Sequence, residues 1–255
     1  MLNVAFIGCS WTQGYNIPYN HTYPFIVHEL LNEYKVNNRV INAGRSGSSW
    51  VTYPSTMKYM HETYDADIFV IQHTTPDRGL LSFASDQWKY QKITRDHDVY
   101  DSKDRSSLGS YLQLWDNTQS YYHLTIGMAE QIIADEPSEL VQHIFHEIQR
   151  KSTLTKQEII DRVSYWYNQE RHHPINFEKY SETVEYCNYY AKDKSKKIVN
   201  LFWLDDEFSK SFTNLDNKII VQNNIDFDRY AIDAGYHFDD KGNKVLAELL
   251  IPQLL

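Results

Sequence analysis

The sequence predicts a single α/β domain over residues 1–255, a three-layer sandwich in which helices cover both faces of a parallel sheet of about four or five strands. Short, continuous apolar runs alternate with helical patterns in the first third of the chain. Strands of a parallel sheet have this uninterrupted apolar character because both of their faces are covered. A chain of 255 residues is also long enough to bury one such core.

The expected elements can be placed from apolar periodicity. Segments with the pattern of buried strands occupy residues 3–7, 39–42, 67–72, 196–203 and 217–221. Helices of the core are expected over residues 21–34, 56–63 and 241–250. The apolar runs and the helical segments therefore follow one another in the order that builds parallel strands with crossover helices.

The middle of the chain, about residues 80–195, has a different character and is predicted to be a mostly helical insertion between the third and fourth strands. Residues 80–105 are polar and aromatic without a clear period, which is typical of an irregular segment. Helices are expected over residues 120–134, 138–151, 155–168 and 177–191. Thr155 and Glu158 have the spacing of a capping box at the start of one of them.

Composition excludes several classes of protein. The formal net charge of −9 gives no electrostatic footprint for nucleic acid. No apolar stretch is long enough to cross a bilayer, and the N-terminus carries no positively charged leader, so we expect a cytoplasmic protein without membrane partners. Cys9 and Cys187 are too few for a disulfide framework and are expected to be free thiols.

Two fragments at opposite ends of the chain carry residues suited to nucleophilic catalysis. Ser10 lies in the turn Gly8–Gly14 directly after the first strand, where ligands bind in open parallel sheets. A serine hydroxyl needs a base within hydrogen-bond reach to act as a nucleophile. His237 precedes the last predicted helix, with Asp233 four residues before it, and could supply that base.

These fragments resemble the conserved blocks of the SGNH (GDSL-like) serine hydrolases. Gly8-Cys9-Ser10 is similar to the first block, with Cys in the place of Asp, and residues 42–49 look like the second, in which Gly47 matches the oxyanion-hole glycine. The run from Asp233 through His237 to Gly242 looks like the closing block. The resemblance covers about the first 77 and the last 25 residues. It implies a flavodoxin-like fold, with Ser10 as nucleophile and His237 as base.

The chain departs from the family pattern in two places. The carboxylate that orients the histidine normally lies three residues before it, where this chain has Ala234. Asp233, Asp239 or Asp240 could take that role, or the site could work as a Ser–His dyad. The third block normally supplies an oxyanion-binding Asn, but this strand continues through residues 72–78 without one. Gln72, His73 or Thr74 could donate instead, and Arg78 could place a positive charge nearby.

The resemblance implies a serine esterase that needs no cofactor or metal and acts on a small-molecule or glycan ester. The prediction of a glycan substrate is based on the 20 Tyr and 6 Trp residues. Their aromatic faces could stack on sugar rings, or they could simply pack in the core. Trp11 lies beside the predicted site and could form a wall for the substrate or pack in the core. An acyltransferase using the same Ser10–His237 pair, or a catalytically weak scaffold that acts as a binding protein, are the alternatives.

Two further patterns are weaker candidates for functional sites. His143, His146 and Glu147 share a predicted helix, and His172-His173 follow, but the spacing is not that of a zinc protease. Cys9 could be a nucleophile in its own right. Its place in the resemblance, however, is one whose side chain usually points into the core, so an inert buried thiol is expected.

Overall fold

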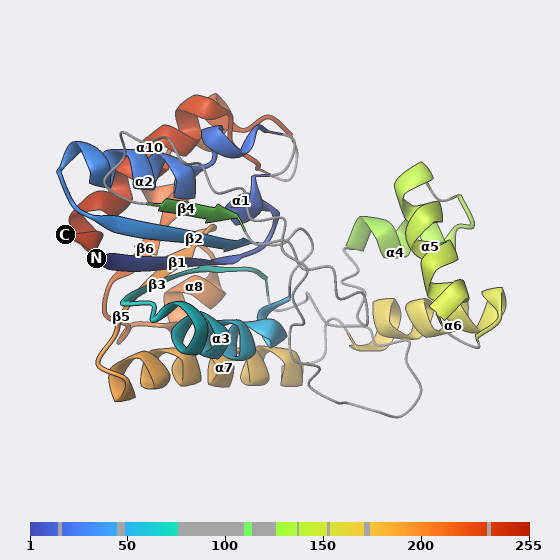
Figure 1. The fold of residues 1–255 in the computed structure, drawn as a ribbon. Helices are drawn as coiled ribbons and strands as arrows, with labels where there is room; N and C mark the ends of the chain where they lie inside the picture. The colour runs from blue at the N-terminus through green and yellow to red at the C-terminus, as the bar shows by residue number, and fades with distance from the viewer. Residues whose placement is uncertain are drawn as a thin grey trace.

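A computed structural model describes residues 1–14, 17–44, 49–75, 110–113, 126–136, 138–151, 154–170, 174–233 and 236–255. Its centre is one six-stranded sheet, in which every pairing is parallel (Figure 1). The strands, in spatial order, are β4 (Ser110–Gln113), β2 (Asn38–Gly44), β1 (Leu2–Gly8), β3 (Ile68–His73), β5 (Lys197–Phe202) and β6 (Lys218–Ile220). The predicted α/β class with a parallel sheet is confirmed.

The sheet has one strand more than expected. β4, at one edge, lies within the stretch predicted to be a mostly helical insertion. Its two apolar residues lie between Ser110 and Gln113 and form no continuous apolar run, which is why the pattern missed it. Without β4, the order of the other five strands along the sheet is 2-1-3-4-5 when they are counted in chain order, which is the flavodoxin-like doubly wound arrangement.

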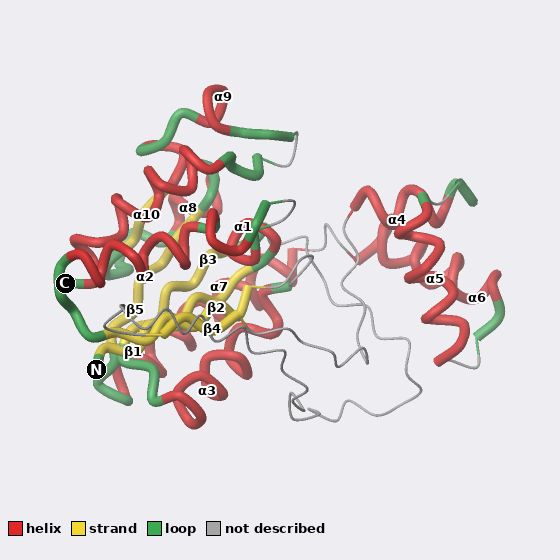
Figure 2. The backbone as a smooth tube through the Cα atoms, turned by 45° about the horizontal axis from the view of Figure 1, so that its top comes forward, coloured by secondary structure: helices red, strands yellow, loops and turns green. Residues whose placement is uncertain are grey.

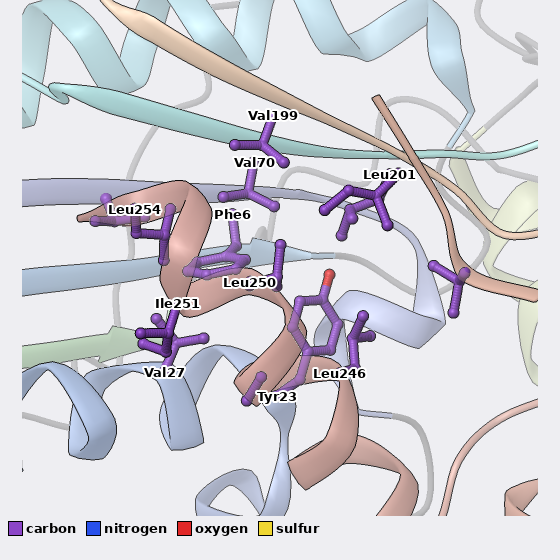
Figure 3. Close-up of a cluster of buried hydrophobic side chains, with 14 of the residues drawn as sticks. Phe6, Tyr23, Val27, Val70, Val199, Leu201, Leu246, Leu250, Ile251 and Leu254 are labelled. Carbon is purple, nitrogen blue, oxygen red and sulfur yellow. The ribbon is translucent and has the colours of Figure 1, made fainter. Parts of the chain in front are cut away.

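Helices cover both faces of the sheet, as Figures 1 and 2 show. Helices α2 (Tyr23–Glu33) and α10 (Asp240–Leu254) lie on one face, and α3 (Tyr53–Tyr64) and α7 (Pro174–Asp193) lie on the other. Successive residues of β1 alternate between the two cores: Val4 and Phe6 belong to the first, Ala5 and Ile7 to the second. Figure 3 shows part of the first core, where Phe6 of β1 lies among side chains of α2 and α10.

Three helices of the insertion form a hydrophobic cluster of their own. They are α4 (Ile126–Ile133), α5 (Glu139–Lys151) and α6 (Lys156–Tyr165), the last followed by a π-helical turn, η3 (Trp166–Glu170). The predicted capping box at the start of α6 is confirmed, because Glu158 N–H donates to Thr155 Oγ1 and Thr155 N–H donates to Glu158. The organisation of the chain as a single domain stays a prediction.

The remaining elements are short. They are α1 (Ser10–Gln13), α8 (Glu207–Ser211), α9 (Phe227–Tyr230) and the 3₁₀ turns η1 (Tyr19–His21), η2 (Trp50–Thr52) and η4 (Val221–Asn223). Within the described ranges, no helix combines the length and the apolar character needed to cross a membrane.

The strand order creates a switch point at the carboxyl end of β1. The chain leaves β1 for β2 on one side and later returns to β3 on the other. The two connections that leave β1 and enter β3 therefore run over opposite faces of the sheet. Open parallel sheets bind ligands in the crevice that forms between such connections, at the carboxyl ends of the strands. Ser10 follows β1 directly, so it lies at this point.

Candidate active site

Ser10 is the first residue of α1, two residues after β1 ends at Gly8. Cys9 occupies the N-cap position between them, and its backbone N–H donates to Gln72 Oε1 at 2.9 Å. The turn packs tightly on the neighbouring strands. A Cβ on Gly44 of β2 would lie 2.5 Å from the backbone nitrogen of Gln13, so only glycine allows α1 to approach β2 this closely. Ser10 itself is only 8% exposed.

The residues before α10 form a closed loop that presents His237. Ile232 N–H donates to the His237 carbonyl at 2.7 Å, and Tyr236 N–H donates to the Asp233 carbonyl at 3.1 Å. Tyr236 has φ of +57°, a left-handed conformation that reverses the chain direction. The loop therefore folds Asp233 back onto His237 even though four positions separate them.

Ser10, His237 and Asp233 form a chain of hydrogen bonds. His237 Nε2 lies 2.8 Å from Ser10 Oγ, and His237 Nδ1 lies 2.9 and 2.8 Å from the two carboxylate oxygens of Asp233. A carboxylate only accepts hydrogen bonds, so Nδ1 carries the imidazole proton. Nε2 is then left as an acceptor for the Ser10 hydroxyl. This is the geometry of a nucleophile, a general base and a group that orients the base.

The two other carboxylates considered for this role have partners elsewhere. Asp239 is the N-cap of α10 and accepts the Gly242 N–H at 2.7 Å. The Asp240 carboxylate lies 2.6 Å from His21 Nδ1. In the structure, the carboxylate beside His237 is therefore that of Asp233.

Asn243, which the sequence analysis did not single out, fixes the start of α10 against α2. Its side-chain nitrogen donates to the carbonyls of Phe238 and Asp239, each at 3.0 Å, and its oxygen accepts the backbone N–H of Tyr23 at 3.1 Å. Because Phe238 is the residue after His237, this buried amide anchors the loop that carries the histidine.

The residues predicted to bind the oxyanion differ in whether the structure describes them and whether their polar groups already have partners. Gly47 and Arg78 lie outside the described residues. Gln72 is fully buried, and both ends of its amide are engaged within the fold: Oε1 accepts the Cys9 N–H, and Nε2 donates to the His73 carbonyl at 2.8 Å. Its side chain thus holds the turn before Ser10.

Thr74 is held in place through its backbone, while its hydroxyl has no partner among the described residues. Thr74 N–H donates to the Tyr53 hydroxyl at 3.2 Å, and the Tyr180 hydroxyl donates to the Thr74 carbonyl at 2.8 Å. Tyr53 OH also donates to the carbonyl of Gln72 at 2.8 Å. Thr74 is 4% exposed, and its Oγ1 is a buried polar atom without a hydrogen bond in the described structure. Such an atom is uncommon in a folded protein.

His73 is buried in an aromatic setting beside Thr74. Its ring stacks on Phe202, with centroids 4.5 Å apart, and its Nε2 lies 2.9 Å from Asn200 Oδ1. Nδ1 is a buried atom with no hydrogen-bond partner in the described part of the chain. Burial lowers the pKa of His73 to about 4, although the hydrogen bond to Asn200 acts in the opposite direction.

The lowered pKa of His73 predicts a dependence of stability on pH. Between pH 6.5 and pH 4 the unfolded chain takes up a proton at this residue while the folded protein does not. The unfolded state binds more protons, so stability falls as the pH falls through this range, by about 3 kcal/mol at pH 4. The free energy of unfolding of wild type minus that of His73→Phe, measured in urea at each pH, should decrease by this amount between pH 7 and pH 4. Parallel curves for the two proteins would show that the folded state also protonates His73.

Trp11 forms one wall of the site. Its ring stacks on Trp203, with centroids 4.6 Å apart and an interplanar angle of 7°, and its centroid lies 6.4 Å from that of His237. Trp203 follows β5 directly, so the stack connects the turn after β1 with the end of β5. Trp11 was predicted to lie beside the site. Trp203 was not, because its position there depends on the strand order.

Cys9 is fully buried, and its sulfur lies 3.9 Å from Ser10 Oγ. Among the described residues, no group of three or more His, Cys, Asp or Glu side chains could hold a metal ion. The side chains of His143 and Glu147 and the pair His172-His173 are not among those described.

Comparison with known proteins adds little to this geometry. No family model and no curated protein matches the chain. Among solved structures, the chain is similar to a protein from Desulfitobacterium hafniense DCB-2 that is assigned to the G-D-S-L family of lipolytic proteins. The identity is 10%, the TM-score is 0.33, and the alignment covers 100% of both chains.

Proposed function

We propose that the protein is a serine esterase that hydrolyses a carboxylic ester, with Ser10 as the nucleophile, His237 as the general base and acid, and Asp233 as the residue that orients His237. The observation that carries this proposal is the hydrogen-bonded chain Ser10–His237–Asp233 at the carboxyl end of β1. Its three members come from the two ends of the sequence, and the fold brings them within hydrogen-bond distance.

The reaction follows from the protonation states of the site. Ser10 Oγ attacks the ester carbonyl carbon while His237 Nε2 takes the hydroxyl proton, and the carbonyl oxygen becomes an oxyanion. The carbonyl re-forms as the bond to the leaving oxygen breaks, and His237 gives its proton to that oxygen. A water molecule then attacks the acyl carbon while His237 Nε2 takes its proton. The bond to Ser10 Oγ breaks, His237 returns the proton to that oxygen, and the carboxylic acid leaves.

Two groups are suited to stabilising the oxyanion. The backbone N–H of Ser10 is at the first turn of α1, where helices leave N–H groups without an intrahelical partner. The Thr74 hydroxyl follows β3, the strand next to β1, and is buried without a partner among the described residues. We assign to Thr74 the role that an Asn has in the family, because Gln72 is bonded to the turn. Gly47 is a third candidate donor on the resemblance alone.

The test of the proposed function is release of p-nitrophenol from p-nitrophenyl acetate and longer esters by purified protein, compared with Ser10→Ala. Equal rates for the two proteins on every ester would contradict it. Product analysis with and without an added alcohol separates hydrolysis from acyl transfer, because a transferase forms a new ester only when the acceptor is present.

The role of Thr74 predicts a loss of kcat. Thr74→Val removes the hydroxyl and keeps the branched shape, and kcat is expected to fall about 10²–10³-fold, as when one oxyanion donor is removed. KM should change little, because the oxyanion forms only in the transition state. Thr74→Ser is the matched control and should retain most of the activity. A normal kcat in a folded Thr74→Val protein would exclude Thr74 from the oxyanion hole.

A further inference from the structure

Two residues that are next to Ser10 and His237 in the sequence are joined through one buried tryptophan. Trp203 follows β5 directly and is 3% exposed. Its ring stacks on that of Trp11, the residue after Ser10. Its indole N–H donates to the carbonyl oxygen of Tyr236, the residue before His237, at 3.3 Å. A side chain from a third part of the chain therefore contacts both fragments of the proposed site.

Trp203 is itself fixed by the first core. Its ring centroid lies 5.0 Å from that of Phe238 and 6.0 Å from that of Phe227. Its backbone carbonyl accepts the N–H of Gln222 at 3.2 Å, in η4. In the sheet, β3 separates β5 from β1, so the stack with Trp11 spans the end of β3. The indole is therefore held by packing and by its own backbone, independently of the loop that it contacts.

The loop before His237 needs such a support. Tyr236 has φ of +57°, and this left-handed conformation is unfavourable for a bulky side chain. It persists only where the surrounding contacts hold it. One of these contacts is the hydrogen bond from Trp203 to the Tyr236 carbonyl. On the other side of His237, the Phe238 carbonyl accepts from Asn243. Side chains outside the loop thus hold the peptide groups before and after the histidine.

The buried N–H couples the position of the loop to that of the indole. An indole N–H removed from water needs an acceptor, and for Trp203 this acceptor is the Tyr236 carbonyl. If the loop moved His237 away from Ser10, the N–H would lose its acceptor in a buried position, and the cost of that loss opposes the movement. Trp203 is too deeply buried to offer a ring face to a substrate. Its contribution therefore concerns geometry and not substrate binding.

We propose that Trp203 is a positioning residue, which keeps His237 Nε2 at its distance of 2.8 Å from Ser10 Oγ. It does so through the Trp11 ring beside the nucleophile and the Tyr236 carbonyl beside the base. This inference rests on the proposed esterase function. Proton transfer from Ser10 to His237 requires hydrogen-bond contact, and misplacement of a catalytic group by about 1 Å can lower a rate about 10²-fold. The contribution of Trp203 therefore belongs to kcat.

The first test removes the indole N–H and keeps the rings. Trp203→3-benzothienylalanine, introduced site-specifically, has sulfur in the place of the N–H, so the shape and the stack on Trp11 remain. On p-nitrophenyl acetate, kcat should fall about tenfold, a part of the loss that a misplacement of about 1 Å causes, and KM should change little. Trp203→Phe also shortens the stacked ring system, and its kcat should fall about 10²-fold.

Ile251→Val is the matched control for lost stability. Ile251 is a buried residue of the same core, on α10, and this change costs about as much folding free energy as the loss of one hydrogen bond. With every protein assayed well below its unfolding temperature, its kcat should equal that of wild type. An equal loss of kcat in Ile251→Val and Trp203→3-benzothienylalanine, or no loss in the latter, would overturn the positioning role.

The ¹⁵N signal of His237 Nε2 tests the geometry without any substrate. This signal depends on the hydrogen bond to Ser10, and Ser10→Ala gives its value without that bond. In long-range ¹H–¹⁵N spectra, Trp203→3-benzothienylalanine should move the signal toward the Ser10→Ala value, and Ile251→Val should not.

The spectrum and the assay together separate this proposal from the proposed function. The shift in a protein that turns over no ester would support the role of Trp203 and contradict the esterase function. Turnover that depends on Ser10, with kcat and the His237 signal unchanged when the indole N–H is absent, would overturn the positioning role alone. Neither turnover nor a shift would overturn both.

Discussion

Replacing Ser10 with alanine is expected to lower kcat on p-nitrophenyl acetate by about 10⁶-fold, to the level that binding and oxyanion stabilisation provide alone. His237→Ala should cost about as much, because Ser10 Oγ is a poor nucleophile unless Nε2, 2.8 Å away, takes its proton. The double variant should be no slower than either single variant, since the two residues act as one unit. Initial rates of p-nitrophenol release measure all three.

Matched substitutions elsewhere control for effects on folding. Ser55→Ala removes a serine of α3 whose hydroxyl bonds only to the nearby Thr52 carbonyl in the described contacts, and His61→Ala removes a histidine that bonds to Tyr190 on the opposite face from α10. Both should keep kcat within about threefold, because neither side chain bonds to Ser10, His237 or Asp233 in the described contacts. A fluorophosphonate should label Ser10 in wild type and in these controls. Full activity of Ser10→Ala would exclude Ser10 as the nucleophile.

Asp233→Asn is expected to give the second-largest loss, about 10²–10⁴-fold in kcat, the upper value being that of a wrong histidine tautomer. An amide can donate to Nδ1, which favours the tautomer with its proton on Nε2. That proton blocks acceptance of the Ser10 hydroxyl proton. The loss should appear in kcat and leave KM nearly unchanged, because the substrate does not touch Asp233 in the proposed mechanism.

Asp240→Asn provides the matched control for this prediction. Asp240 is close in sequence and its side chain is 60% exposed, but its carboxylate pairs with His21 rather than His237. We expect a normal kcat for this variant. The opposite pattern, with Asp240→Asn inactive and Asp233→Asn active, would contradict the assignment of the orienting carboxylate.

The sequence was most informative where a short pattern has one physical meaning. Continuous apolar runs predicted five of the six strands, because strands covered on both faces have few polar residues. Spacing also predicted the capping box of Thr155 and Glu158, whose bonds are local in the chain. The edge strand β4 was missed, since its sequence has only two apolar residues, between Ser110 and Gln113, and forms no continuous apolar run.

The candidate site was predictable to a smaller extent. Ser10 and His237 could be predicted because Ser10 follows the first strand and His237 precedes the last helix. Both lie in fragments that resemble sequence blocks of the SGNH hydrolases. Gln72 of β3 was a candidate oxyanion donor. In the structure its amide oxygen accepts the backbone N–H of Cys9, which lies in the turn after β1. Which partner an amide finds depends on how neighbouring strands are paired, and sequence patterns do not contain that information.

By itself, then, the sequence determined the fold class, the parallel strands and the two fragments that carry Ser10 and His237, because these depend on local apolar patterns and turn residues. The tertiary structure alone decided that Asp233 rather than Asp239 or Asp240 faces His237, and that His73 Nδ1 and Thr74 Oγ1 are left without described partners. The physical reason is that hydrogen bonds act over about 3 Å, and only the paired strands and closed loops of the folded chain bring residues far apart in sequence within that distance.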